Sequence, residues 1–213
     1  LLFLEDKSLL ISKAIDNKKI FQQQEIDIEM DEHDKSTFEN LDLVTYEYEL
    51  KKNIWKNLQE YQEMTLKWEK MQIMEIKLEE METKIKKWKE LCIIGTKDLD
   101  NSQVTTEFLE KVNMYEKYSH ILSIIQNNNI QKVDYLKEML RSALNLAIID
   151  FNDNSLFLEK IINIKDLFNA IPTLDEINKR ANEENRIKIL YNDNLNKFNS
   201  HHIPLKLKVD EKG

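Results

Sequence analysis

The sequence predicts an all-α protein: an elongated antiparallel helical bundle with one long helix and a short C-terminal strand. Only two glycines and two prolines occur in 213 residues, too few for the turns of a sandwich, barrel or βα fold. Charged residues make up 33% and hydrophobic residues 41%, which suits helices with one solvated and one buried face. Apolar residues recur at steps of three and four from Ile54 to Cys92, and this is the helical period.

The long helix is expected over residues 44–92, which contain neither Pro nor Gly. Two helices that meet near Met71 are the open alternative. The mean step between inward positions is about 3.5 residues, close to a heptad. Ser36 or Asn40 could cap its start, and Gly95, after a Lys-rich turn, is expected to end it. The inward positions, with two polar exceptions at 65 and 75, are Ile54, Leu58, Tyr61, Thr65, Trp68, Met71, Glu75, Leu78, Met81, Ile85, Trp88 and Cys92.

Shorter helices are expected on both sides of this one. A helix over 1–21 leads into an extended acidic segment, 22–39. Later helices are expected over 103–126, 130–149, about 155–170 and 173–199, with a break at 127–129. Thr173 and Glu176 form a capping-box pattern at the start of the last helix. The residues of that helix expected to face inward are Ile177, Ala181, Ile187, Tyr191 and Phe198.

The end of the sequence alternates apolar and polar residues over 202–209, a strand pattern. A lone strand is unstable, so its partner is expected beyond Gly213. The chain is therefore expected to be a piece of a longer polypeptide. Within the chain, three segments are expected. These are a helical and acidic lead-in (1–40), a helical bundle (41–199) and the start of a β segment (200–213).

Net charge, hydropathy and cysteine content limit the partners and the cellular compartment expected for this chain. The net charge of −8 argues against nucleic-acid binding, which needs a basic surface. No apolar run is long enough for a membrane span, so no membrane partner is expected. The single cysteine, Cys92, excludes an intrachain disulfide and fits a reducing compartment.

No catalytic, cofactor-binding or metal-ligating residue is predicted. A phosphate loop would need a second glycine near Gly95, and an EF-hand would need one within the acidic segment. Adjacent His201 and His202 diverge, which suits a metal poorly. His33 lies in a solvated acidic run, and His120 is expected to be a partly buried structural residue. The remaining candidates are read as core or packing residues: Cys92, Trp55, Trp68 and Trp88.

One stretch, 41–55, followed by Leu58, Tyr61 and Trp68, resembles the start of the linker region of dynein heavy chains. The similarity continues through 79–81 and 87–89, and through the apolar run 121–125. The last helix carries the family's I-x3-A-x2-E-x2-I pattern as Ile177, Ala181, Glu184 and Ile187, with Phe198 where a Trp is usual. Departures are Asp134-Tyr135 in place of a His-Trp pair and Asn residues in place of the Arg and Pro of the turn. The resemblance covers roughly 38–198.

The resemblance implies a mechanical linker that joins the tail of a dynein heavy chain to its AAA+ motor ring in ATP-driven microtubule movement. This piece would be no enzyme and would hold no cofactor, because ATP and Mg would bind in the ring. Its partners would be the ring of the same heavy chain and other dynein chains, with microtubules reached only through the parent. A cytoskeletal location follows, and we favour a ciliary axoneme because axonemal heavy chains are the more numerous class.

Two other classes of function stay open. The first is a structural coiled-coil or helical-bundle scaffold without motor activity. A spectrin-like array would repeat its Trp positions, whereas all three Trp residues lie in one half of this chain. The second is an enzyme inside a helical bundle, which would need inward carboxylates or an E-x-x-H motif, and none is present.

Overall fold

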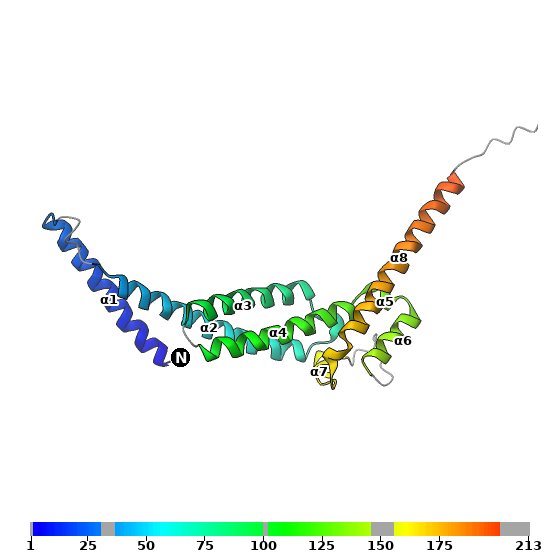
Figure 1. The fold of residues 1–213 in the computed structure, drawn as a ribbon, viewed down its shortest axis with the longest axis horizontal. Coiled ribbons are helices and arrows are strands. Elements are labelled where there is room, and N and C mark those ends of the chain that lie inside the picture. Colours follow the sequence, from blue (N-terminus) through cyan, green and yellow to red (C-terminus); the bar gives the residue numbers. More distant parts are fainter. Residues whose placement is uncertain (1, 31–36, 100–101, 146–155, 201–213) are drawn as a thin grey trace, which may run out of the picture. The chain divides into compact units, whose positions relative to one another are not determined.

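The computed structural model describes residues 2–30, 37–99, 102–145 and 156–200 (Figure 1). Within these ranges the chain is helical, and the only β pairing is an isolated bridge between Gln72 and Phe157. The all-α prediction is confirmed. The strand predicted over 202–209 lies outside the described residues. The helices are α1 (Leu2–Asp27), α2 (Glu39–Glu69), η1 (Ile73–Glu75), α3 (Leu78–Asp98), α4 (Gln103–Ile125), α5 (Asn128–Gln131), α6 (Asp134–Ala143), α7 (Leu158–Ile162), η2 (Leu167–Ala170) and α8 (Ile171–Ser200).

The chain divides into two compact units. Unit 1 consists of Leu1–Lys70 and Lys77–Lys117, and unit 2 consists of Met71–Ile76 and Tyr118–Gly213. The short connection between α2 and α3 therefore belongs to unit 2, although both helices belong to unit 1. Helix α4 contributes its first fifteen residues or so to unit 1 and its end to unit 2.

Unit 1 is built on a three-helix bundle of α2, α3 and the first part of α4, which lie side by side in Figure 1. Ile54 lies beside Gly95, whereas Glu60, further along α2, pairs with Lys84, which comes earlier in α3. The contacts run in opposite order along the two helices, so α2 and α3 are antiparallel. Gly95 lies beside Thr105 and Lys89 forms an ion pair with Glu116, so α3 and α4 are antiparallel as well. The antiparallel bundle predicted from the sequence is thus present in this unit.

Helix α1 packs against the start of α2 in the same unit. The Lys18 ammonium donates to the Asp42 carboxylate at 2.6 Å and lies 5.5 Å from the centre of the Phe38 ring. The helix continues to Asp27, so the extended segment predicted from residue 22 is wrong as far as 27. No helix breaker occurs there, and an amide-to-carboxylate hydrogen bond from Gln23 to Asp27 (2.8 Å) supports the last turn.

The single long helix predicted over 44–92 is wrong, and the alternative of two helices that meet near Met71 is right. Helix α2 ends at Glu69, and α3 begins at Leu78. Two apolar residues of the connection, Ile73 and Ile76, are buried, whereas Glu75 is exposed. The helix stops here because tertiary burial of these isoleucines outweighs local helical propensity.

Gly95 does not end α3, as the sequence suggested, but lies inside it, and α3 continues to Asp98. Its backbone is not in the left-handed region. A Cβ atom at this position would lie 2.7 Å from Ile54 Cδ1 and 2.8 Å from Thr105 Cγ2. The glycine is therefore needed for the close approach of α2, α3 and α4, rather than for a turn.

Unit 2 contains contacts among α5, α6 and α8. The predicted break at 127–129 is right only in part: α4 ends at Ile125, but Asn128 and Asn129 already lie in α5. The Asn127 side chain accepts a hydrogen bond from the Asn129 amide at 2.8 Å and caps α5. The single helix predicted over 130–149 is wrong: Lys132 and Val133 separate α5 from α6, and α6 ends at Ala143. Asn145, just after it, adopts a left-handed backbone (φ 51°). The predicted helix near 155–170 is split into α7 and η2, which Asp166 separates, also with a left-handed backbone (φ 55°).

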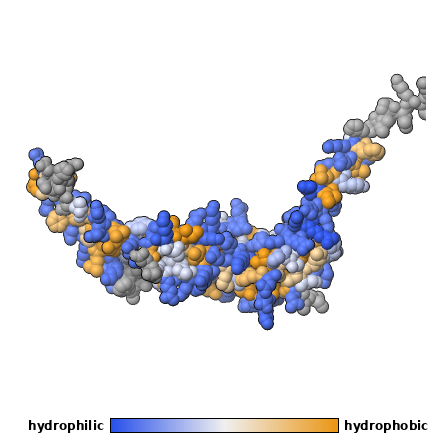
Figure 2. All heavy atoms as spheres, viewed as in Figure 1, coloured by the Kyte–Doolittle hydropathy of each residue, from blue (hydrophilic) through white to orange (hydrophobic). Residues whose placement is uncertain are grey.

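Helix α8 begins two residues before the predicted start, so Thr173 lies inside it and the capping box is wrong. Pro172 fits the first turn, where its missing N–H group costs nothing. Ile177 and Ala181 are buried as predicted, but the later inward positions are exposed: Ile187 (63%), Tyr191 (64%) and Phe198 (72%). Orange, hydrophobic surface is visible on distal α8 in Figure 2, which agrees with the exposure of Ile187 and Phe198.

Candidate functional site

The centre of the bundle in unit 1 is a cluster of five aromatic side chains from α2, α3 and α4. The Tyr61 ring makes edge-on contacts with Trp88, Phe108 and Tyr115, with ring centres 5.3–5.5 Å apart. Trp68 lies 6.0 Å from Trp88 and 6.2 Å from Tyr115. Each edge-on pair adds about 0.5–1.5 kcal/mol beyond its burial, so the cluster joins three helices tightly.

The polar ends of this cluster have hydrogen-bond partners. The Tyr115 hydroxyl donates to Glu69 Oε1 at 2.5 Å, and the Tyr61 hydroxyl donates to the Lys111 carbonyl at 3.4 Å. Burial, together with the neighbouring Glu69 carboxylate, raises the pKa of Tyr115 well above its ordinary value, so the phenol stays protonated. Each tyrosine thus fixes the relative position of α2 and α4.

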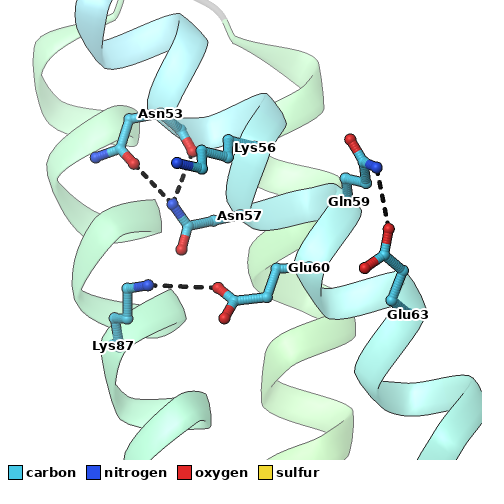
Figure 3. Close-up of a pocket in the computed structure, with 7 residues that line it drawn as sticks. All are labelled: Asn53, Lys56, Asn57, Gln59, Glu60, Glu63 and Lys87. Atoms are coloured by element: carbon cyan, nitrogen blue, oxygen red, sulfur yellow. Dashed lines mark hydrogen bonds and ion pairs between the residues drawn. The ribbon is translucent and has the colours of Figure 1, made fainter.

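A second set of contacts joins α2 to α3 through one carboxylate, that of Glu60 (Figure 3). It accepts hydrogen bonds from the ammonium groups of Lys84 and Lys87 (3.3 Å for Lys87) and from the Trp88 indole N–H (3.5 Å). The hydrogen bond from Lys84 is the largest cause that lowers the pKa of Glu60, and burial opposes it. The carboxylate is therefore ionised and neutralised, which leaves it no role as an acid or base near neutral pH.

A surface pocket of about 510 Å³ lies beside this carboxylate (Figure 3). Asn57 is buried in its wall and donates through Nδ2 to the Asn53 carbonyl (2.8 Å) and to Asn53 Oδ1 (2.7 Å). No hydrogen-bond partner of Asn57 Oδ1 occurs among the described residues. The lining contains amides and ion-pairing groups but no Ser, Cys or His that could act as a nucleophile or base. The full lining is Asn53, Lys56, Asn57, Gln59, Glu60, Glu63 and Lys87.

The three tryptophans and Cys92, which the sequence assigns to packing, differ in burial. Trp68 and Trp88 are buried packing residues, as predicted, whereas Trp55 is 47% exposed and packs only in part. Cys92 is fully buried on the inner face of α3, and burial raises the pKa of its thiol to about 11, so it is an unreactive core residue, as predicted.

Of the four histidines, the structure describes only His120. His120 is more exposed than expected, and its Nε2 lies 2.7 Å from Asp175 Oδ1, which joins α4 to α8 within unit 2. His33, His201 and His202 lie outside the described residues. No group of three metal-ligating side chains occurs in the part of the chain that the structure describes.

Within unit 2, polar side chains of α6 and α8 contact each other. The sequence did not indicate that these residues would be neighbours. Arg180 lies 5.2 Å from the centre of the Tyr135 ring and donates to Glu184 at 3.0 Å. A hydrogen bond with Tyr135 is the main cause that lowers the pKa of Glu184. Tyr135 and Glu184 both belong to the sequence patterns noted above, so the structure brings together positions almost fifty residues apart.

The described helices include none long and apolar enough to cross a membrane. No curated protein and no solved structure matches the chain. A family model, the dynein heavy chain N-terminal region 2, matches residues 41–209, which is most of the sequence. That region is a non-catalytic part of a motor heavy chain, associated with the cytoskeleton. The chain therefore belongs to the dynein heavy chain family, within N-terminal region 2.

Proposed function

We propose that this chain is a segment of the mechanical linker of a dynein heavy chain, joining the tail to the AAA+ ring. This proposal rests on the match of residues 41–209 to the dynein heavy chain N-terminal region 2. In this role the chain transmits force from nucleotide-driven movements of the ring and performs no chemistry itself. ATP and Mg bind in the ring of the parent chain, and microtubules are reached only through that parent.

The packing of unit 1 supports a role that needs stiffness. A segment that transmits force must not deform internally, and a close-packed core has low compressibility. Five aromatic residues join α2, α3 and α4, and the Glu60 carboxylate adds ion pairs between α2 and α3. Close helix contact at Gly95 leaves no room for a Cβ atom.

For the location we favour the ciliary axoneme over the cytoplasm, on the abundance of axonemal heavy chains. Other dynein chains are further candidate partners. Identification of the parent polypeptide tests both points.

The test uses the parent heavy chain with two fluorophores, one in the first AAA+ module and one on this segment at Thr96→Cys. Thr96 is exposed on α3, and buried Cys92 will not compete for the label. A linker must move against the ring, so energy transfer is expected to change between the nucleotide-free and ATP-bound states. Unchanged transfer would contradict the proposal and favour the scaffold alternative.

A matched control places both labels inside unit 1, at Thr96→Cys and at Gln59→Cys on the exposed face of α2. Because the bundle is proposed to move as one body, this pair is expected to show the same transfer in every nucleotide state. A change here would show that the segment deforms internally, and the rigid role would then be wrong.

A further inference from the structure

The connection between α2 and α3 has a sequence that favours helix but a structure that is not helical. Residues 70–77 contain no Gly, no Pro and only one kind of β-branched residue, isoleucine. The heptad positions continue through it, from Trp68 and Met71 to Leu78 and Met81, with Glu75 at the one polar position between them. Nevertheless Gln72, Ile76 and Lys77 adopt extended backbone angles, and only a short 3-10 turn forms between them.

Contacts inside unit 2 hold this connection in its bent form. The Gln126 side-chain amide donates to the carbonyls of Ile73 (2.5 Å) and Ile76 (2.9 Å). Ile73 and Ile76 are buried, so their carbonyls need hydrogen-bond donors. The Ile73 carbonyl also accepts from Ile76 N at 3.4 Å. Two backbone hydrogen bonds add to this, from Ile73 N to the Leu156 carbonyl (2.9 Å) and from Leu158 N to the Met71 carbonyl (3.2 Å).

We propose that the α2–α3 connection is a two-state hinge and that Gln126 selects its bent form. In the other form α2 and α3 continue as one helix, and two copies of the chain exchange partners. Helix α2 of one copy then packs against α3 and α4 of the other, so the aromatic contacts of the bundle are re-formed between copies. Only the contacts of residues 71–76 are lost, and new helical hydrogen bonds partly replace them.

The balance between the two forms therefore depends on a few hydrogen bonds rather than on the core. A buried carbonyl that loses its donor costs stability, and Gln126 supplies a donor to two of them. This inference does not depend on the linker role, because it concerns only how this chain closes on itself.

The experiment measures the monomer and dimer fractions of the 213-residue chain by light scattering after refolding over a range of concentrations. Gln126→Leu is expected to raise the dimer-to-monomer ratio by about tenfold. The matched control is Gln131→Leu. It also removes an amide that donates to a carbonyl at the end of α4 (Ile125, 2.6 Å), and this carbonyl lies outside the connection. The control is expected to leave the ratio unchanged.

A proline tests whether any dimer contains the continuous helix. Lys77 is exposed, has φ −78°, and follows a residue with ψ 120°, so Lys77→Pro fits the bent form. In a continuous helix the same proline would be strongly unfavourable. Gln126→Leu with Lys77→Pro is therefore expected to return to the monomer.

Glu75→Leu gives an independent route if Gln126→Leu does not fold. Glu75 is exposed in the bent form, and its replacement by Leu completes the heptad of the continuous helix. This variant is expected to raise the dimer fraction and to lose that rise when Lys77→Pro is added. A monomeric Glu75→Leu chain, or a dimer that Lys77→Pro leaves intact, would overturn the proposal.

Discussion

Helix α3 and helix α8 carry the same kind of apolar pattern but differ in how much of it is covered. Along α3 every predicted inward position from Met81 to Cys92 is buried. Along α8 the inward positions are buried through Ala181, and beyond it they are exposed. Both helices lie in stretches that the periodicity predicted to be helical, although their ends differ from the predicted ones. The pattern thus specifies the helix and its apolar face, whereas burial of that face depends on which other elements reach it.

The two helices also differ in what their apolar faces contribute to stability. A residue buried in the bundle contributes its transfer free energy and its packing contacts. A residue on distal α8 contributes little within the described chain, because solvent already reaches it. Paired substitutions on buried and exposed positions of the same residue type make this difference measurable.

The largest effect is expected at the aromatic cluster. Trp88→Ala removes a fully buried side chain that contacts Tyr61 and Trp68, and it is expected to lower the free energy of unfolding by about 3–5 kcal/mol. Trp55→Ala, at a half-exposed position of α2, is the control and should cost much less. Urea titrations of both variants check the difference. Equal losses would mean that the cluster is not the centre of stability.

The next effect compares two isoleucines ten residues apart on α8. Ile177 is 1% exposed and Ile187 is 63% exposed. Ile177→Ala is expected to lower the free energy of unfolding by about 2–5 kcal/mol, and Ile187→Ala to change it by no more than about 0.5 kcal/mol. Thermal unfolding followed by circular dichroism gives both values. A large loss for Ile187→Ala would show that distal α8 is covered in solution.

These differences explain how much the sequence could predict. The helical structure of the stretches that form α2, α3 and α4 follows from local periodicity, so it was predictable. The break near Met71 had a partial signal, since Glu75 interrupts the apolar series. The feature that stabilises the break, the Gln126 amide, lies some fifty residues away in sequence, and no local pattern reveals it.

The candidate site was less predictable than the helices. Trp68, Trp88 and Cys92 were expected to be inward, but their aromatic neighbours from α4 depend on how the helices pack. The Glu60 carboxylate looked like any other acid on a solvated face, because its lysine partners lie more than twenty residues further along the chain. Gly95 was assigned to a helix end because a glycine needed for close packing has the same local signature as one needed for a turn.

Gly95 provides a test with a distinctive sign. In an exposed helix Gly→Ala stabilises by up to about 1 kcal/mol, but here the new Cβ would meet Ile54 and Thr105 below 3 Å. Gly95→Ala is therefore expected to lower the free energy of unfolding by about 1–2 kcal/mol. Ile54→Val removes the nearest atom, so the double variant should lose less than the sum of the single losses. Stabilisation by Gly95→Ala would contradict the close approach.

The smallest effect concerns the ion pairs of Glu60, and its sign follows from the direction of the pKa shift. Because the folded state lowers the pKa of Glu60 below its ordinary value of 4.5, the stabilisation is present above that value and is lost as pH falls through the folded pKa. Glu60→Gln removes this dependence and should cost only about 0.2–1 kcal/mol at pH 7, since the side chain is one-third exposed. Unfolding free energies at pH 7 and pH 3 should therefore differ less in Glu60→Gln than in the wild type.

Glu63→Gln is the matched control. It removes a carboxylate that accepts a hydrogen bond from the Gln59 amide, and it should keep the wild-type difference between pH 7 and pH 3. If Glu63→Gln alters the pH dependence as much as Glu60→Gln, the lysine contacts across α2 and α3 contribute no specific stabilisation.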